Sequence, residues 1–302
     1  MKDLLITHIK DIDGLSPVIL MNLWGKSFEY KLLDTFEVGT YLTELLTQDL
    51  QDYEHIYIVD LTVPEEIYPM IEKSKDRHKF LIFDHHETHN YARSYPYVTL
   101  DMEECGTTLF YQYLQTQGLS TNPSLDQYIE AVKDLDLWTF EKNHNTLSPQ
   151  LGSLLELLGE TRYIDEITAL LRVETQSFTF SPFLNRLLEL EEENKKRYID
   201  KREERMIRGT LFKDVNIGMV YAEKYRSEIG DELLKRHPDL DVIVIVNMNG
   251  GISLRSRDVD VSKIASYFGG GGHIHASGIG IPLEIRKEVF KTLLKGEIHI
   301  ED

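Results

Sequence analysis

The sequence contains very little cysteine: Cys105 is the only one among 302 residues. A lone thiol can neither form an intrachain disulfide nor supply a zinc site made of several thiolates, so we expect a reducing, cytoplasmic setting. Long apolar runs are also missing, since none approaches the roughly 20 residues that span a bilayer. Within residues 1–8, charged side chains occur too early for the apolar run of a signal peptide. We therefore expect no membrane segment.

Basic residues are scarce relative to acidic ones. Lys and Arg number 33 and Asp and Glu number 51, which gives a net charge of −18. Nonspecific binding of long nucleic acid requires many Lys and Arg side chains to neutralise phosphates, so this charge argues against it. A phosphate-bearing substrate would need metal ions or a few placed basic residues, which favours small or short substrates.

Apolar, β-branched runs alternate with helical patterns along the chain, which predicts an α/β protein. At 302 residues the chain more readily forms two domains than one. We expect a catalytic domain with a parallel sheet at residues 1–181 and a smaller mixed α/β domain at residues 210–302. A long helix over residues 182–208, densely charged beyond its apolar start, predicts a helical linker at 182–209 that stops at Gly209.

A short apolar run, residues 80–83, predicts a buried strand, and Asp84, His85 and His86 follow it directly. In an open α/β sheet, ligands bind at the carboxyl edge of the strands. This carboxylate and these imidazoles are therefore the first candidate functional residues.

A second group lies where the predicted first strand, residues 4–8, turns into a helix. His8, Asp11 and Asp13 offer ligands for a divalent cation, and Gly14 lets the backbone turn tightly. Capping of the helix by the aspartates explains the same pattern equally well.

Asp60 ends another predicted strand, residues 55–59. Taken alone, an Asp in this position is more often a helix cap than a ligand. Parallel strands joined by right-handed crossovers, however, bring their carboxyl ends to one edge of the sheet. Because the strands that end near His8, Asp60 and Asp84 all carry metal-compatible side chains, we favour a shared metal site.

Two later segments offer further candidates. Thr107 and Thr108 open a predicted helix at residues 105–114, where free N–H groups suit an anion, although ordinary capping explains them better unless a metal site lies nearby. Asp134 and Asp136 lie near the end of the next predicted helix, and either could complete a metal site.

Four consecutive glycines, residues 269–272, precede His273. So many glycines carry a large cost in conformational entropy, which indicates a loop that closes around a ligand and presents N–H groups to an anion. A flexible loop is the weaker alternative. Arg255 and Arg257, on a predicted neighbouring strand, supply guanidinium groups suited to phosphate.

In order along the chain, these motifs resemble the DHH phosphoesterase superfamily in the form that carries a DHH-associated carboxyl-terminal domain. The matching segments are Asp11-Ile12-Asp13-Gly14, Asp60, Asp84-His85-His86, Gly270-Gly271-Gly272-His273 and Ala276-Ser277-Gly278. The resemblance covers nearly the whole chain. It implies a phosphodiesterase that uses two metal ions, usually manganese.

The resemblance also implies which residues hold the metals. One ion would be bound by His8, Asp11 and Asp60. The other would be bound by Asp13, Asp60, His85 and either Asp134 or Asp136. Asp136 is preferred because it heads a segment closer to the family's motif.

The remaining roles implied by the resemblance concern orientation and substrate. Asp84 would orient the neighbouring ligands, and His86 would face the scissile phosphate. Contacts with the substrate's phosphate or terminal nucleotide would come from Arg255, Gly270, Gly271, Gly272 and His273.

Carboxylates and imidazoles without cysteine suit Mn²⁺, with Mg²⁺ or Co²⁺ as substitutes. Together with the resemblance, this chemistry leads us to expect an oligoribonuclease-like enzyme that hydrolyses short oligonucleotides or dinucleotides, with two metal ions activating water. Alternative substrates are 3′-phosphoadenosine 5′-phosphate, cyclic dinucleotides and, less favoured by the glycine motif, pyrophosphate. A non-catalytic nucleotide-binding regulator is the alternative from another class. The sequence leaves room for a homodimer.

Overall fold

The computed structural model describes residues 1–173 and 175–293. By its internal contacts the chain forms two units, unit 1 (Met1–Leu190) and unit 2 (Glu191–Asp302). The division falls inside α8 (Pro182–Glu203), the helix predicted as a linker. Within the described ranges, no helix is long and apolar enough to cross a membrane.

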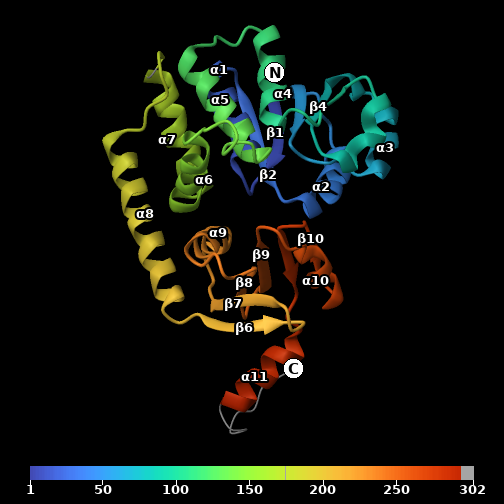
Figure 1. Cartoon of the computed structure of the whole chain (residues 1–302). Helices are drawn as coiled ribbons and strands as arrows, with labels where there is room; N and C mark the ends of the chain where they lie inside the picture. The colour runs from blue at the N-terminus through green and yellow to red at the C-terminus, as the bar shows by residue number, and fades with distance from the viewer. Residues whose placement is uncertain (174, 294–302) are drawn as a thin grey trace. The chain divides into compact units, whose positions relative to one another are not determined.

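Unit 1 is organised around a five-stranded sheet with the order β2-β1-β3-β4-β5 (Figure 1). Its strands are β1 (Lys2–His8), β2 (Phe28–Leu33), β3 (Tyr53–Val59), β4 (Phe80–Asp84) and β5 (Val98–Leu100). Every neighbouring pair is parallel, which confirms the predicted parallel sheet. The carboxyl ends of all these strands therefore lie along one edge.

Helices cover both faces of this sheet. They are α1 (Ile12–Trp24), α2 (Val38–Leu45), α3 (Tyr68–Lys73), α4 (Gly106–Thr116), α5 (Pro123–Asp136), α6 (Leu147–Leu158) and α7 (Glu160–Val173). Successive residues of a strand point to opposite faces. Accordingly, Leu5 of β1 packs in the core with α1 and α4, whereas Leu4 and Ile6 pack in the core with α2 and α3.

Unit 2 contains a six-stranded mixed sheet with the order β10-β11-β9-β8-β7-β6. The strands are β6 (Ile207–Leu211), β7 (Val215–Tyr221), β8 (Val242–Asn247), β9 (Gly251–Ser256), β10 (Gly271–Gly272) and β11 (Ala276–Ile279). Only β7 and β8 pair in parallel among these described strands. This mixed sheet confirms the smaller mixed α/β fold expected near the carboxyl terminus.

The helices of unit 2 are α9 (Arg226–Arg236), α10 (Val261–Tyr267) and α11 (Leu283–Leu293). Apolar residues of α9 and α10 pack in separate cores with residues of the sheet. The expected extension of the linker helix to residue 208 is wrong. Helix α8 ends at Glu203, because residues Ile207–Leu211 pair as β6 with β7 and satisfy their backbone groups in the sheet instead.

Candidate active site

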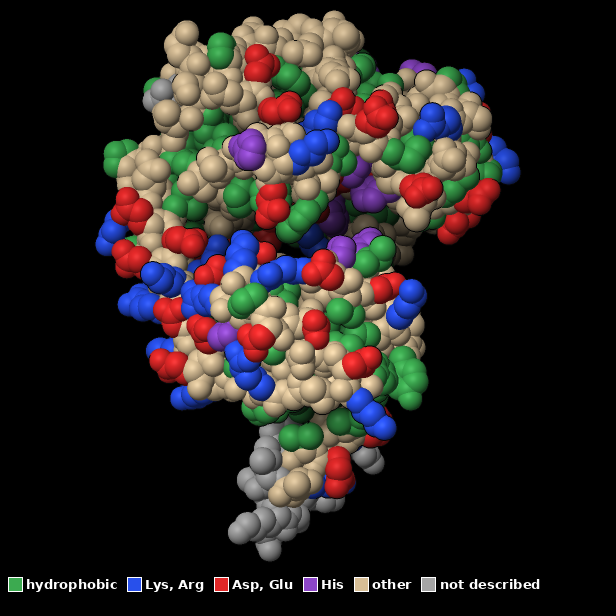
Figure 2. Space-filling view, in the orientation of Figure 1, with side chains coloured by type: hydrophobic (Ala, Val, Ile, Leu, Met, Phe, Trp, Pro, Cys, Tyr) green, Lys and Arg blue, Asp and Glu red, His purple; other side chains and the backbone are tan. Residues whose placement is uncertain are grey.

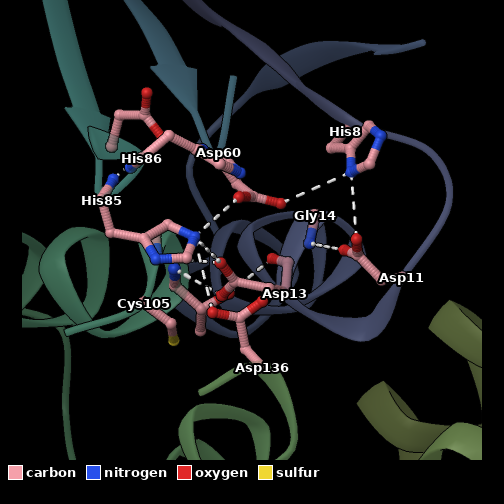
Figure 3. A network of polar contacts seen from close by, with 12 residues as sticks. His8, Asp11, Asp13, Gly14, Asp60, His85, His86, Cys105 and Asp136 are labelled. Carbon is pink, nitrogen blue, oxygen red and sulfur yellow. Dashed lines mark hydrogen bonds and ion pairs between the residues drawn. The ribbon is translucent and has the colours of Figure 1, made fainter. Parts of the chain in front are cut away.

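Three strand ends meet at the carboxyl edge of the sheet in unit 1 (Figure 3). His8 ends β1, Asp60 follows β3, and His85 follows β4. Because β1, β3 and β4 are neighbours in the sheet, their ends lie side by side. The turn after β1 adds Asp11, the first turn of α1 adds Asp13, and the end of α5 adds Asp136 (Figure 3).

One cluster contains His8, Asp11 and Asp60. The His8 Nδ1 atom lies 3.1 Å from Asp11 Oδ2 and 3.7 Å from Asp60 Oδ2. The other oxygen of Asp11 caps α1 by accepting a hydrogen bond from the Gly14 N–H at 2.9 Å. Asp11 is thus both a helix cap and a candidate ligand, which are the two roles that the sequence left open.

A second cluster forms around His85 (Figure 3). The His85 Nε2 atom lies 3.4 Å from Asp60 Oδ1, 3.4 Å from Asp136 Oδ2 and 3.9 Å from Asp13 Oδ2. Asp60 therefore directs one carboxylate oxygen toward His85 and the other toward His8. It is the residue that the two clusters share.

The backbone at Asp60 is unusual. Its φ angle is 55°, in the left-handed region that non-glycine residues rarely adopt. Its N–H donates to the Phe83 carbonyl at 2.9 Å, which ties the end of β3 to β4. Strained backbone of this kind persists where the surroundings hold it and is concentrated at functional sites.

The start of α4 holds Asp13 in place. The Gly106 and Thr107 N–H groups donate to the two Asp13 carboxylate oxygens, each at 2.8 Å, and the Thr107 hydroxyl donates to the Asp13 carbonyl. The Thr108 hydroxyl lies 3.2 Å from the Cys105 sulfur. These polar groups thus form hydrogen bonds within unit 1. The expected role of Thr107 and Thr108 in substrate binding stays a prediction.

Asp84 is completely buried and accepts hydrogen bonds on both carboxylate oxygens. Oδ1 accepts from the His85 N–H at 2.8 Å and contacts His86 Nδ1 at 2.7 Å. Oδ2 contacts His89 Nδ1 and accepts from the Thr62 hydroxyl at 3.3 Å. Although its oxygens lie close enough to Asp60 and His85 to join a metal cluster, they are already occupied by these donors.

The structure separates Asp134 from Asp136. Asp134 is buried in a polar cage, where its carboxylate accepts from the Thr139 hydroxyl and from the side-chain amides of Asn143 and Asn145 at 2.6–2.8 Å. Asp136 instead faces His85. The arrangement favours Asp136 as the ligand and gives Asp134 a structural role at the end of α5.

Burial and crowding of like charges raise the pKa values of two carboxylates at this edge. Burial and the neighbouring Asp13 raise the pKa of Asp60, and the same causes raise the pKa of Asp136. Hydrogen bonds to carboxylates raise the pKa of His8 to about 10. Burial lowers the pKa of His85, but the facing carboxylates outweigh it and raise this pKa to about 9. The edge therefore favours positive charge, from protons or from cations.

The facing donors fit divalent metal ions. Three groups of side chains have ligand atoms within 4.8 Å of one another. Two are the facing sets, His8, Asp11 and Asp60 in one and Asp13, His85 and Asp136 in the other, and the third joins Asp60 and His85 with Asp84 and His86. The buried His85 Nε2 and Asp136 Oδ2 atoms find no hydrogen-bond partner among the described residues. Such orphaned atoms are costly unless a ligand satisfies them. Oxygen and imidazole donors without thiolate suit Mn²⁺ or Mg²⁺.

The expected substrate-binding residues of unit 2 lie near one another in its sheet. The Arg255 guanidinium, on β9, donates to the Ser227 hydroxyl at 3.2 Å. β9 pairs with β11, and β11 pairs with β10, which contains Gly271 and Gly272. His273 follows, and its N–H donates to the Ala276 carbonyl at 2.8 Å. Their contact with a substrate stays a prediction.

Sequence reasoning missed some supporting residues. His89 and Thr62 hold the Asp84 carboxylate, and Gly106 allows α4 to approach Asp60 closely. Thr62 and His89 lie in connecting segments with no periodic pattern, and Gly106 resembles an ordinary helix start. Only their positions in space reveal what they contact.

Comparison with known proteins places the chain in a family. Residues 222–299 match the DHHA1 domain. Over 294 residues the chain is 33% identical to the oligoribonuclease NrnB of Bacillus subtilis (strain 168), an alignment that covers 91% of this chain and 72% of that protein. The chain therefore belongs to the DHH family of phosphoesterases and is a hydrolase, which confirms the resemblance found in the sequence.

More distant relatives agree with this assignment. A 3′,5′-cyclic-nucleotide phosphodiesterase from Helicobacter pylori (strain ATCC 700392 / 26695) is 20% identical over 317 residues, which cover 90% of this chain and 91% of that protein. The solved structure of the pGpG-specific phosphodiesterase PggH from Vibrio cholerae matches with a TM-score of 0.53 at 16% identity, covering 97% of this chain and 98% of that one. This second likeness shows a shared fold.

Proposed function

We propose that this protein is a metal-dependent phosphodiesterase that hydrolyses short oligonucleotides or dinucleotides, with two divalent cations, preferably Mn²⁺, in its site. The observation that carries the proposal is the pair of facing ligand sets that share Asp60. The substrate class is supported by the relative at 33% identity, which is named an oligoribonuclease.

Each ligand set has a defined part in this proposal. His8, Asp11 and Asp60 would hold one cation, and Asp13, His85 and Asp136, again with Asp60, would hold the other. When bound, two such cations acidify a water molecule to a nucleophile at neutral pH and neutralise charge on the reacting phosphate. The protein's contribution is to keep the carboxylates oriented, and the bonds from α4 to Asp13 do this for one of them.

His86 is the candidate for direct contact with the phosphate. Its Nδ1 atom is tied to Asp84 at 2.7 Å, and its side chain is 44% exposed, whereas that of His85 is 12% exposed. The hydrogen bond to Asp84 raises the pKa of His86, which favours a ring that can donate to a phosphate oxygen. His86 would thereby position the substrate and hold a proton near the leaving oxygen.

Unit 2 would bind the substrate's phosphates and terminal nucleotide. Lys and Arg side chains gather around α8 and α9 on the visible face of this unit, interspersed with acidic side chains (Figure 2). Arg226 opens α9, and burial together with the Arg226 charge lowers the pKa of Arg255. Two guanidinium groups that lie this close together can both donate hydrogen bonds to one phosphate, whose negative charge offsets their mutual repulsion.

A substrate panel tests the proposal most directly. Purified protein with Mn²⁺ is incubated with bis-p-nitrophenyl phosphate, pApA, pGpG, a five-nucleotide RNA, 3′-phosphoadenosine 5′-phosphate, a cyclic dinucleotide and pyrophosphate. We expect hydrolysis of the short linear nucleotides to be fastest and to stop when EDTA removes the metal. Faster hydrolysis of 3′-phosphoadenosine 5′-phosphate or of the cyclic dinucleotide would replace the proposed substrate class.

A matched pair of variants tests the site. His85→Ala removes the central imidazole of the second cluster and should abolish turnover. His55→Ala removes an imidazole that contacts Asp3 at 3.1 Å, near the start of β3, and should retain it. Undiminished activity in His85→Ala would contradict the site. An absence of metal-dependent turnover in the wild type, together with nucleotide binding, would instead indicate a non-catalytic regulator.

A further inference from the structure

We propose that His89 and Tyr68 are positioning residues that fix the Asp84 carboxylate and, through it, the orientation of His86. The contacts form a continuous chain: Tyr68 hydroxyl to His89 Nε2 at 2.5 Å, His89 Nδ1 to Asp84, and Asp84 to His86 Nδ1 at 2.7 Å. The part that this chain plays in catalysis rests on the proposed function, whereas its geometry does not.

The Asp84 carboxylate has no unused acceptor position. A carboxylate offers about four lone-pair sites in its plane, two on each oxygen. Oδ1 receives the His85 N–H and His86 Nδ1, and Oδ2 receives His89 Nδ1 and the Thr62 hydroxyl. Removal of His89 would leave Oδ2 with only the hydroxyl at 3.3 Å, and a fully buried carboxylate would then lose its fixed rotation.

His89 has the geometry of a relay between two fixed groups. Its side chain is completely buried, in a 3-10 segment (Glu87–Ser94) that follows the Asp84-His85-His86 run. The carboxylate of Asp84 can only accept, so His89 Nδ1–H is the donor to it, and in the neutral ring Nε2 then accepts a hydrogen bond from the Tyr68 hydroxyl. Hydrogen bonds on both sides set the tautomer and the plane of the ring.

Tyr68 anchors the far end of this chain. It is the first residue of α3, it is completely buried, and its ring stacks on Tyr95 with centroids 4.4 Å apart. Burial raises its pKa, so the hydroxyl keeps its proton and remains a donor to His89. Tyr68 and His89 thereby link the packing of α3 to the orientation of His86, whose other ring nitrogen would contact the substrate under the proposed function.

Histidine at position 89 is hard to explain by packing alone. A buried polar ring costs free energy unless both nitrogens are satisfied, and an apolar residue would fill the same space without that cost. Histidine at this position instead supplies an N–H donor to the buried Asp84 carboxylate. The same carboxylate also accepts the His85 N–H, but that donor is a backbone group, so of the two residues that follow β4 only His86 has its side chain tied to Asp84.

The test compares His89→Leu, His89→Asn and Tyr68→Phe with the control His55→Leu. His55 also contacts a carboxylate, Asp3, but it lies near the amino end of β3. At saturating Mn²⁺, with bis-p-nitrophenyl phosphate as substrate, His89→Leu should lower kcat about 10- to 100-fold with little change in KM or in bound Mn²⁺. His89→Asn keeps an N–H near the Nδ1 position and should recover most of the loss, Tyr68→Phe should show a smaller loss, and His55→Leu should show none.

A double-mutant cycle separates positioning from general stability. If His89 acts through His86, the effect of His89→Leu should fall to less than about twofold in a His86→Ala background. An undiminished effect in that background, or loss of bound Mn²⁺ in His89→Leu, would overturn the proposal. A failure of His89→Asn to restore activity would also count against it.

A spectroscopic measurement keeps the inference independent of the enzyme assay. In protein labelled with ¹⁵N-histidine, the ring resonances of His86, assigned by comparison with His86→Ala, report which nitrogen carries the proton. We expect the Nδ1–H signal of His86 to shift or broaden in His89→Leu and Tyr68→Phe but not in His55→Leu. Unchanged signals would overturn the positioning role. An inactive wild type with the expected shifts would contradict only the proposed function.

Discussion

Gly106 lies so close to Asp60 that a Cβ atom added to the glycine would come within 2.7 Å of the Asp60 Cβ. Asp60 has little freedom to retreat, because its φ angle of 55° is already in a sparsely populated region and its N–H is bonded to Phe83. The absence of a side chain at position 106 therefore supports the residue that both ligand sets share.

Gly106→Ala should consequently impair the site. We expect a misplaced Asp60 to weaken Mn²⁺ binding and to lower turnover about 10- to 100-fold, since displacements near 1 Å have effects of this size. Calorimetric titration with Mn²⁺ and steady-state kinetics check the two effects. Gly39→Ala in α2 is the control, because its added Cβ would meet only Pro64 at 3.4 Å. Wild-type metal binding in Gly106→Ala would refute the prediction.

Asp134 and Asp136 lie two positions apart on α5 and should respond differently to the same substitution. Asp134→Asn places an amide opposite the donor groups of Asn143 and Asn145, and should lower the free energy of unfolding by about 1–3 kcal/mol. Asp136→Asn removes a charge crowded by other carboxylates, so the metal-free protein should be at least as stable as the wild type.

Urea unfolding of the metal-free variants and Mn²⁺ titration of both check this difference. Asp136→Asn should lose affinity for Mn²⁺ and turnover, while Asp134→Asn should keep both at temperatures where it is folded. The reverse pattern would show that Asp134 is the ligand.

The glycine loop of unit 2 offers another matched pair. A Cβ at Gly270 would come within 2.1 Å of the Gly278 carbonyl oxygen, whereas a Cβ at Gly271 would meet no atom within 4 Å. Gly270→Ala should therefore destabilise unit 2. Gly271→Val should leave the melting temperature nearly unchanged but raise KM for pApA, because the added side chain would fill space proposed for substrate. Unchanged KM in Gly271→Val, with bound Mn²⁺ also unchanged, would argue against a substrate role for this loop.

The stability of unit 2 should depend on pH through Glu203. Burial acts to raise the pKa of Glu203, but the hydrogen bonds with Arg236 at 2.6 Å and with His237 at 2.7 Å outweigh it, and the pKa is lowered. A carboxyl group whose pKa is lowered by folding stabilises the folded state at pH values above its pKa in the unfolded chain, which is about 4.3 for Glu. This contribution is lost as the pH falls through the pKa of the folded state. Wild type should thus exceed Glu203→Gln in stability near neutrality.

Urea unfolding at a series of pH values from about 7 to about 3 measures this effect. The difference in unfolding free energy between wild type and Glu203→Gln should narrow as the pH falls below about 4.5. A difference that stays constant across the range would contradict the assignment of this pH dependence to Glu203.

Much of the architecture could be predicted from local patterns. The apolar runs that end at Val59 and Phe83 are short and β-branched or aromatic, so they identified buried parallel strands and hence one shared carboxyl edge. Residues 204–208 were predicted as helix because their charges resemble those of the preceding helix, but α8 ends at Glu203 and Ile207–Leu211 pair with β7 as a strand.

Residue types and their order along the chain set the chemistry available to this protein: carboxylates and imidazoles after successive strands, a glycine loop, and no second cysteine. The folded structure determines which contacts each of these side chains makes. It directs the two oxygens of Asp60 to different clusters, separates the caged Asp134 from Asp136, and saturates Asp84 with donors that include His89. Strand periodicity specifies which edge a residue reaches, but the direction of a carboxylate depends on contacts from distant segments that no local pattern encodes.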